Sequence, residues 1–397
     1  MQVGIVGAPN QGKSTFFNAA TLAGAEMAPY PFTTIKANQG VGFIRVDCPC
    51  KEFNVRCNPT HGCCVHGDRF VPVTLLDVAG LVPDAHLGKG LGNQFLDDLR
   101  QASALIHVVD ISGSTNSNGE KVEPGSFDPA ETVRFLEKEI DMWFFSILKN
   151  NWGKFARKIQ LDGTKLSESI TNQLSGLGVV EERVTESIEF CKLGSKKPTE
   201  WGDDDLLGFA TKLREVSKPI IIAANKIDVE GSEANLERLS KEFPDYAIMP
   251  VSAESELALR NASKAGIIEY TPGGSDFTII DEAKLNGKQR AGLHFLKKFL
   301  ERHKTTGVQE VLNASVFQLL KYIVVYPVGP KLSDSKGNIL PDAYLLPSDS
   351  TVLGFAYAVH TDFGKNFVSA IDVKTKRNVG KDHVLKNCDV IELVCGK

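Results

Sequence analysis

The chain has 397 residues, more than one ordinary domain holds, so we expect two or three domains. Hydrophobic residues make up 42% and charged residues 24%, the composition of a globular protein that can bury a sizeable core. The net charge of -4 argues against a chain coated in positive charge for nucleic acid, but allows one local basic face. The start of the chain shows no secretory signal, and no apolar run reaches membrane-spanning length. We therefore expect a cytoplasmic protein, monomeric by default, that does not cross a membrane.

Five short apolar runs predict the strands of a mostly parallel sheet. Runs of this kind suit strands that are buried on both faces. All but the first end at a polar residue, and ligands of open α/β sheets sit outside the carboxyl ends of the strands. The strand ends therefore indicate one site. The runs cover residues 3–6, 71–76, 104–109, 219–224 and 247–251.

Residues 116–215 are too many for a simple connection between the third and fourth strands, and their pattern predicts a helical insertion. Asp128-Pro129 is typical of a helix N-cap followed by proline at the first helical position. Helical spacing then recurs along the segment. The expected helices cover residues 131–149, 165–177 and 180–191.

Beyond the fifth strand the chain changes character twice. Residues 266–320 form an expected helical connecting segment, and residues 321–397 a small separate α+β domain. Residues 1–115 and 216–265 then remain for the sheet domain. The elements expected after the sheet are helices at 288–303 and 308–320, strands at 323–326 and 391–394, and a helix start at 348–351.

The loop after the first strand fits the phosphate-binding pattern G-x-x-x-x-G-K-[ST], between a strand and a helix. Its glycines let the backbone curl, so that the N–H groups face phosphates at a helix N-terminus. Lys13 would place a positive charge at the β- and γ-phosphates, and the Ser14 hydroxyl would bind Mg²⁺. The expected phosphate-binding residues are Gly7, Ala8, Pro9, Asn10, Gln11, Gly12, Lys13, Ser14 and Thr15.

Two further motifs predict contacts at the γ-phosphate. Asp77 begins the pattern D-x-x-G at the end of the second strand, where its carboxylate would hold Mg²⁺ and the Gly80 N–H would meet the γ-phosphate. Thr34 lies between the two motifs, in Tyr-Pro-Phe-Thr-Thr at 30–34, and would bind Mg²⁺ in a switch loop. A plain turn opened by Pro31 is the alternative for this segment.

The tetrapeptide Asn-Lys-Ile-Asp at 225–228 follows the fourth strand and predicts recognition of guanine. The Asp228 carboxylate would accept from the N1–H and the exocyclic amine, a pair of donors that adenine lacks. Lys226 would lie along the base, and Asn225 would tie this loop to the phosphate-binding loop. Ser252-Ala253, after the fifth strand, would offer a backbone N–H to the guanine carbonyl.

These five motifs together resemble the G motifs of the Obg-related GTPases, and Tyr-Pro-Phe-Thr-Thr is characteristic of that group. Residues 85–93, Ala-His-Leu-Gly-Lys-Gly-Leu-Gly-Asn, narrow the resemblance to the YchF/Obg-like subfamily and its archaeal relatives. The tail, at 359–363 and 387–391, resembles a TGS domain. The expected fold is therefore a doubly wound P-loop NTPase sheet with a helical insertion and a small, β-grasp-like α+β domain at the C-terminus.

The resemblance implies a cytoplasmic protein that binds GTP and GDP and hydrolyses GTP. It also implies a link to ribosomes or translation, with the TGS and helical domains touching ribosomal RNA or protein. Several YchF-type relatives have a degraded guanine motif and accept ATP. The motif at 225–228 is intact here, which predicts that the protein prefers GTP to ATP. An ATP-preferring, YchF-type ATPase is the alternative.

The motifs that predict nucleotide binding do not identify the residue that would activate water for hydrolysis. Ras-like enzymes orient the attacking water with a glutamine just after D-x-x-G, and Leu81 stands there in this chain. Intrinsic hydrolysis should be slow, or vestigial in a nucleotide-gated binding module. His86 could orient the water, although an exposed loop histidine is an equal alternative. Asn10 could help to bind K⁺, as in several Obg-related GTPases. The expected catalytic residues are Lys13, Thr34, Gly80 and His86.

Five of the eight cysteines fall between residues 48 and 64. Cys48, Cys50, Cys57 and Cys63 are spaced C-x-C-x₆-C-x₅-C and could close a tetrahedral Zn²⁺ site. The paired C-x₂-C knuckles of common zinc ribbons are absent from this segment. Disulfides and free thiols are the alternatives.

Overall fold

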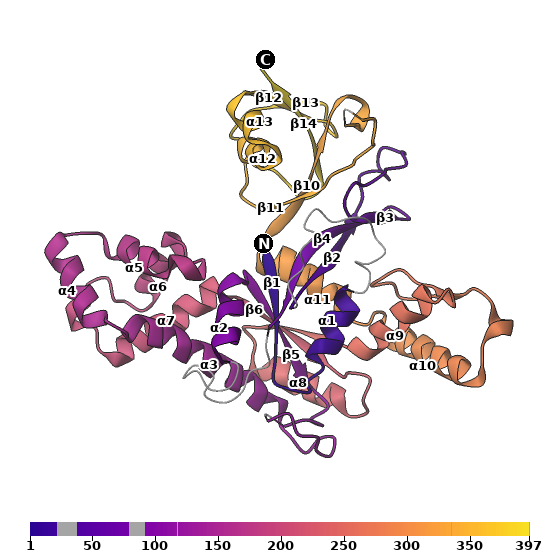
Figure 1. Cartoon of the computed structure of the whole chain (residues 1–397), viewed down its shortest axis with the longest axis horizontal. Helices are drawn as coiled ribbons and strands as arrows, with labels where there is room; N and C mark the ends of the chain where they lie inside the picture. Colours follow the sequence, from indigo (N-terminus) through magenta and orange to yellow (C-terminus); the bar gives the residue numbers. More distant parts are fainter. Residues whose placement is uncertain (22–37, 79–91, 117, 335, 397) are drawn as a thin grey trace. The chain divides into compact units, whose positions relative to one another are not determined.

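The computed structural model describes residues 1–21, 38–78, 92–116, 118–334 and 336–396 (Figure 1). The chain divides into two compact units. Unit 1 comprises Met1–Ala19 and Thr74–Val311, and unit 2 comprises Ala20–Val73 and Leu312–Lys397. The domain boundaries expected from changes in the sequence pattern, at residues 115, 215, 265 and 320, stay a prediction.

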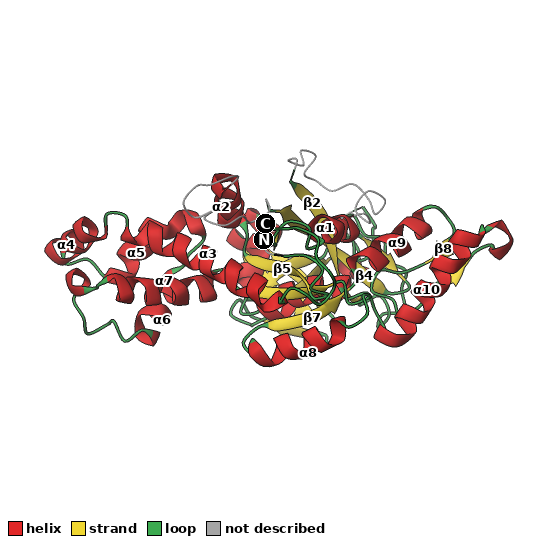
Figure 2. Ribbon diagram, turned by 90° about the horizontal axis from the view of Figure 1, so that it is seen from below, coloured by secondary structure: helices red, strands yellow, loops and turns green. Residues whose placement is uncertain are grey.

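A parallel sheet forms the centre of unit 1. Its strands run in the order β4-β1-β5-β6-β7, in which residues 74–77 of β4 pair with β1. β5 and β6 are buried along their whole length, and Figure 2 shows helices on both sides of the strands. The bounds are β1 (Gln2–Val6), β4 (Asp68–Asp77), β5 (Ala104–Asp110), β6 (Ile220–Asn225) and β7 (Ala247–Val251).

The helices around this sheet begin and end close to their sequence signals. Asn286 and Gln289 form a reciprocal capping box at the start of α10, and a short π-helical turn (Ser315–Leu319) follows α11. β8 (Ile268–Glu269) and β9 (Thr278–Ile279) pair in antiparallel register and form a two-stranded sheet. The helices are α1 (Lys13–Thr21), α2 (Gly92–Gln101), α8 (Ser232–Glu242), α9 (Ala253–Lys264), α10 (Gly287–His303) and α11 (Val308–Ala314).

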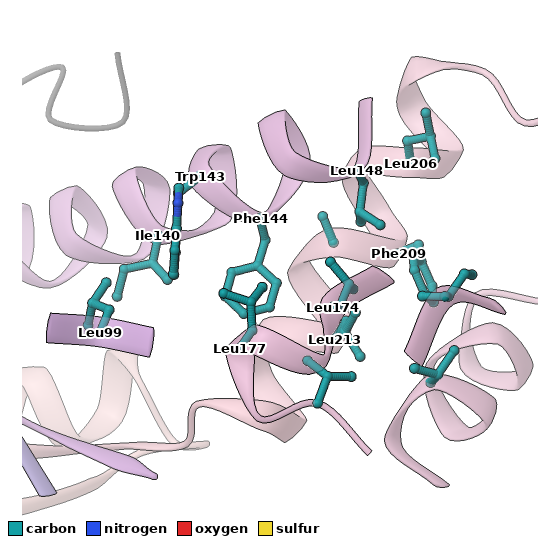
Figure 3. Close-up of a cluster of buried hydrophobic side chains, with 14 of the residues drawn as sticks. Leu99, Ile140, Trp143, Phe144, Leu148, Leu174, Leu177, Leu206, Phe209 and Leu213 are labelled. Carbon is teal, nitrogen blue, oxygen red and sulfur yellow. The ribbon is translucent and has the colours of Figure 1, made fainter. Parts of the chain in front are cut away.

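Residues 129–217 form the helical part of unit 1 between β5 and β6. Asp128 caps the first helix by accepting a hydrogen bond from the Ala130 N–H, and Pro129 follows it as expected. The helices pack around a buried cluster in which Phe144 of α3 faces Leu177 (Figure 3). Replacing Phe144 by alanine would cost about 3–5 kcal/mol of stability. The helices are α3 (Pro129–Lys149), α4 (Trp152–Asp162), α5 (Leu166–Leu174), α6 (Glu181–Phe190) and α7 (Asp203–Ser217).

Unit 2 holds a five-stranded mixed sheet in the order β11-β10-β14-β12-β13. β10 and β14 are parallel, and the other pairs are antiparallel. Phe355 of α12 packs on the sheet, and Thr351 caps this helix. The bounds are β10 (Tyr322–Val328), β11 (Tyr344–Pro347), α12 (Val352–Val359), α13 (Thr361–Lys365), β12 (Phe367–Asp372), β13 (Arg377–Val379) and β14 (Asp389–Cys395).

Unit 2 also contains an arm, residues 39–73, formed by β2 (Gln39–Asp47), β3 (Cys63–Val65) and the first part of β4. β3 pairs with β4 in antiparallel register. The fully buried Arg69 donates to the carbonyls of Leu340 and Pro341, which anchors the arm to the C-terminal segment of the same unit.

The expected fold class is confirmed: a mostly parallel P-loop-type sheet, a helical region and a small C-terminal domain built on a sheet. Within the part of the chain that the structure describes, no helix is long and apolar enough to cross a membrane.

Candidate functional site

The loop from Gly7 to Ser14 joins β1 to α1. Gly12 has φ +92°, and a Cβ added there would lie 2.1 Å from Asn225 Nδ2. A Cβ on Gly7 would lie 2.7 Å from the Val108 carbonyl oxygen. Both positions therefore require glycine, because the loop backbone passes too close to its neighbours for a side chain.

Lys13 and Asp77 meet at the carboxyl ends of two adjacent strands. Lys13 Nζ lies 2.6 Å from Asp77 Oδ1, and Ser14 at the start of α1 is exposed. The Ser14 hydroxyl and the Asp77 carboxylate offer the oxygen ligands that Mg²⁺ prefers, whereas the Lys13 ammonium suits phosphate. The donor set therefore fits a Mg²⁺ bound against phosphates at this loop.

Asn225 joins three motifs that are far apart in the sequence. It is 3% exposed, and its Nδ2 donates to the Gln11 carbonyl oxygen at 3.0 Å. Its Oδ1 accepts from the Ala253 N–H at 3.1 Å. One buried amide thus holds the loop after β6 against the phosphate-binding loop and the start of α9.

Lys226 is held by a polar network at the end of β5. Its Nζ lies 2.7 Å from Asp110 Oδ2 and 3.2 Å from the hydroxyls of Ser114 and Thr115. Burial raises the pKa of Asp110, but hydrogen bonds from Lys226, Ser112 and Ser114 outweigh it, so the pKa lies below its usual value. The carboxylate is therefore charged and fixes the lysine. In the sequence, Asp110 is marked only as the polar residue that ends the third apolar run, and no local pattern assigns it a role.

The segment after β5 also folds against the phosphate-binding loop. Asn10, at φ +62°, donates from Nδ2 to the Gly119 carbonyl oxygen at 2.7 Å. Gln11 Oε1 accepts from the Asp110 N–H. The amide nitrogen of Asn10 is a donor, so Oδ1 is its side-chain atom with the chemistry to ligate a cation.

Asp228 lies partly buried in a pocket between the loop after β6 and α10, beside Gly231, Phe299 and His303. Ser252 caps α9 by accepting from the Ser255 N–H. The Ala253 N–H already donates to Asn225, so a guanine carbonyl would have to share it.

The remaining expected site residues fall outside the described part of the chain. They are Thr34 in the segment at 30–34, Gly80, Leu81 and His86.

In unit 2 the structure gathers four cysteines whose sulfurs all lie within 4.8 Å of one another: Cys48, Cys50, Cys57 and Cys64. Cys64 takes the place that we expected for Cys63. Both lie on β3, where Cys63 pairs with Phe70 and Cys64 with Arg69. Successive side chains of a strand point to opposite faces, so only one of the two can join the cluster.

Three protein-family models match this chain. "Obg-like GTPase YGR210-like, G4 motif-containing domain" matches residues 223–329, "50S ribosome-binding GTPase" matches residues 2–143, and "TGS domain" matches residues 336–395.

Known proteins are similar along the whole chain. A GTP-binding protein of Methanocaldococcus jannaschii is 50% identical over 394 residues, which cover 99% of this chain and 98% of that protein. The ribosome-binding ATPase YchF of Pasteurella multocida is 28% identical and covers 98% of this chain, with 97% of its own length matched. The crystal structure of a GTP-binding protein from Pyrococcus horikoshii superposes with a TM-score of 0.81 at 42% identity, covering 100% of both chains.

These similarities agree with the phosphate-binding loop, the Asn225 bridge and the C-terminal sheet. The chain therefore belongs to the Obg-like, YGR210-type P-loop GTPases that carry a TGS domain and are related to YchF.

Proposed function

We propose that this protein binds GTP and GDP with Mg²⁺, hydrolyses GTP to GDP and phosphate, and acts as a nucleotide-dependent switch on ribosomes. The observation that carries the proposal is the Asn225 bridge, because it places a guanine-type motif directly on the phosphate-binding loop.

The phosphates would be held by Lys13 and by the backbone N–H groups of residues 7–15, of which Pro9 has none. Ser14 and Asp77 would hold Mg²⁺, together with Thr34, and the bound ion supplies positive charge at the β- and γ-phosphates. The Gly80 N–H would donate to the γ-phosphate. The 2.6 Å contact between Lys13 and Asp77 supports this arrangement, because it brings the proposed phosphate ligand and the proposed Mg²⁺ ligand together.

The base would be read by Asp228, with Lys226 along its face and the start of α9 at its carbonyl. Isothermal titration of GDP, GTPγS, ADP and an ATP analogue in Mg²⁺ buffer tests this assignment. Guanine nucleotides should bind, and adenine nucleotides should not. Asp228→Asn should reduce the preference for guanine by at least about 100-fold, because the carboxylate loses its charge-assisted hydrogen bonds. Glu230→Gln, an exposed carboxylate of the same loop, is the matched control.

Equal or tighter binding of ADP would overturn the guanine assignment. It would also favour the ATPase activity named for the YchF relatives.

Hydrolysis would depend on His86 and on K⁺ held by Asn10, because Leu81 cannot orient water. Single-turnover hydrolysis of GTP should be faster in K⁺ than in Na⁺, and Asn10→Ala should remove the difference. His86→Ala should slow hydrolysis in either salt without weakening GDP binding. If neither ion nor ribosomes raise the rate above that of a Lys13→Ala variant, the protein is a nucleotide-gated binding module and not an enzyme.

Ribosome association would use the TGS domain and the helices of residues 116–215, which would contact ribosomal RNA or protein. The family model named for 50S binding and the ribosome-binding relatives support this proposal. Co-sedimentation of the monomeric chain with ribosomes should be stronger with GTPγS than with GDP. Equal recovery with both nucleotides would contradict a switch. Such a protein would act in the cytoplasm.

A further inference from the structure

The cysteine cluster of the arm lies in unit 2, whereas the phosphate-binding loop and Asn225 belong to unit 1. Cys48 Sγ and Cys57 Sγ are 3.8 Å apart, and so are Cys50 Sγ and Cys64 Sγ. A zinc ion about 2.3 Å from each sulfur of a regular tetrahedron would set the sulfurs about 3.8 Å apart. Two sulfur pairs thus have the spacing of a tetrathiolate site, and all four sulfurs lie within 4.8 Å of one another.

The segment around the cluster has almost no hydrophobic core of its own. The structure describes all residues from 47 to 67. The buried side chains among them are those of Cys48, Pro49 and Cys50. The rest of the segment is turns and the short strand β3. A segment without a hydrophobic core needs a cross-link, and a structural metal supplies folding energy directly.

The same segment carries the contacts of the arm with the C-terminal part of unit 2. Directly after Cys57, the Asn58 N–H donates to the Ile339 carbonyl oxygen at 3.0 Å, and the Thr60 N–H donates to Pro341 at 2.9 Å. The position of Cys57 therefore fixes where this loop meets residues 339–341.

We propose that Cys48, Cys50, Cys57 and Cys64 bind one Zn²⁺ in a closed, structural site that fixes the arm to the C-terminal segment of unit 2. Four sulfur ligands complete the tetrahedron, so no position is left for water or substrate. Cys48 and Cys50 are 2% and 7% exposed, which agrees with a structural and not a catalytic ion. Arg69, buried opposite Cys64 on β4, places a positive charge beside the thiolates.

The test uses the full-length protein. Inductively coupled plasma mass spectrometry of the purified chain should find one zinc per molecule. Cys64→Ser should lose that zinc, whereas Cys63→Ser should keep it, because the neighbouring side chain lies on the other face of β3. Loss of zinc should also lower the melting temperature of unit 2 and leave the affinity for GDP unchanged, which separates this proposal from the nucleotide site.

A second measurement on the wild-type chain keeps the proposal testable if a variant fails to fold. Replacing zinc by Co²⁺ should give the intense visible absorption of a tetrahedral cobalt–thiolate centre. A chain without metal whose mass shows two disulfides, a chain that holds iron in place of zinc, or equal zinc loss in Cys63→Ser and Cys64→Ser would each overturn the assignment.

Discussion

Replacing Asn225 by alanine should weaken guanine-nucleotide binding. The loss should exceed that caused by removing a side-chain-to-backbone hydrogen bond away from the two loops that Asn225 joins. The substitution removes two hydrogen bonds, of 3.0 and 3.1 Å, and leaves the Gln11 carbonyl and the Ala253 N–H buried without that partner. Each such loss costs about 1–3 kcal/mol, so the two together cost about 2–6 kcal/mol. If the nucleotide must supply the lower part of that sum, about 2–3 kcal/mol, to order both loops, the Kd for GDP rises by about 30- to 150-fold.

Isothermal titration of GDP measures the loss, and thermal unfolding without nucleotide measures the accompanying loss of stability. Asn235→Ala is the matched control, because Asn235 Nδ2 also donates to a backbone carbonyl, that of Ile111 at 2.8 Å, from α8. The control should lose stability and keep its affinity. A Kd for Asn225→Ala within about threefold of wild type, or an equal loss in Asn235→Ala, would refute the bridge as the link between the two loops.

Three further predictions concern the interior of unit 1. Gly12→Ala should abolish GDP binding in the same titration while the chain stays folded, because its Cβ would lie 2.1 Å from Asn225 Nδ2. Asp110→Asn should weaken GDP binding by about 2 kcal/mol, since Lys226 loses its charged partner; unchanged binding would show that the lysine is held by the hydroxyls alone. His107 is buried, which lowers its pKa to about 3, whereas the unfolded chain titrates it near the ordinary value of 6.5. The unfolded state therefore binds more protons between these values, and stability falls as the pH falls below 6.5, by about 1.4 kcal/mol per unit. In denaturant titrations His107→Leu should lose this part of the acid sensitivity, which is about 3 kcal/mol at pH 4.5; parallel pH profiles would contradict it.

The features that local patterns determine were predictable. The five strands and the phosphate-binding loop follow from apolar runs and from glycines whose spacing is read within a few residues. The pair Asp128-Pro129 likewise predicts the start of α3. This signal can be read from the sequence because a helix cap contacts only the first turn of its own helix.

The features that depend on long-range contacts were not. The bond between Lys226 and Asp110 joins residues 116 positions apart, and no local signal marks it. Choosing between Cys63 and Cys64 required the register of β3 against Arg69 and Phe70, which spacing alone leaves open. The arm, whose Arg69 is anchored to residues 340–341, has too mixed a pattern for its strands to be recognised.

The amide of Asn225 has a thermodynamic consequence beyond its own two hydrogen bonds. Because it joins the base-reading loop to the phosphate-binding loop, ordering either loop also orders the other. Guanosine and pyrophosphate, offered as separate molecules, would then bind with positive cooperativity, each tightening the site for the other. If the two loops bind the base and the phosphates as proposed, the affinity for the intact nucleotide would exceed what its base and its phosphates contribute independently.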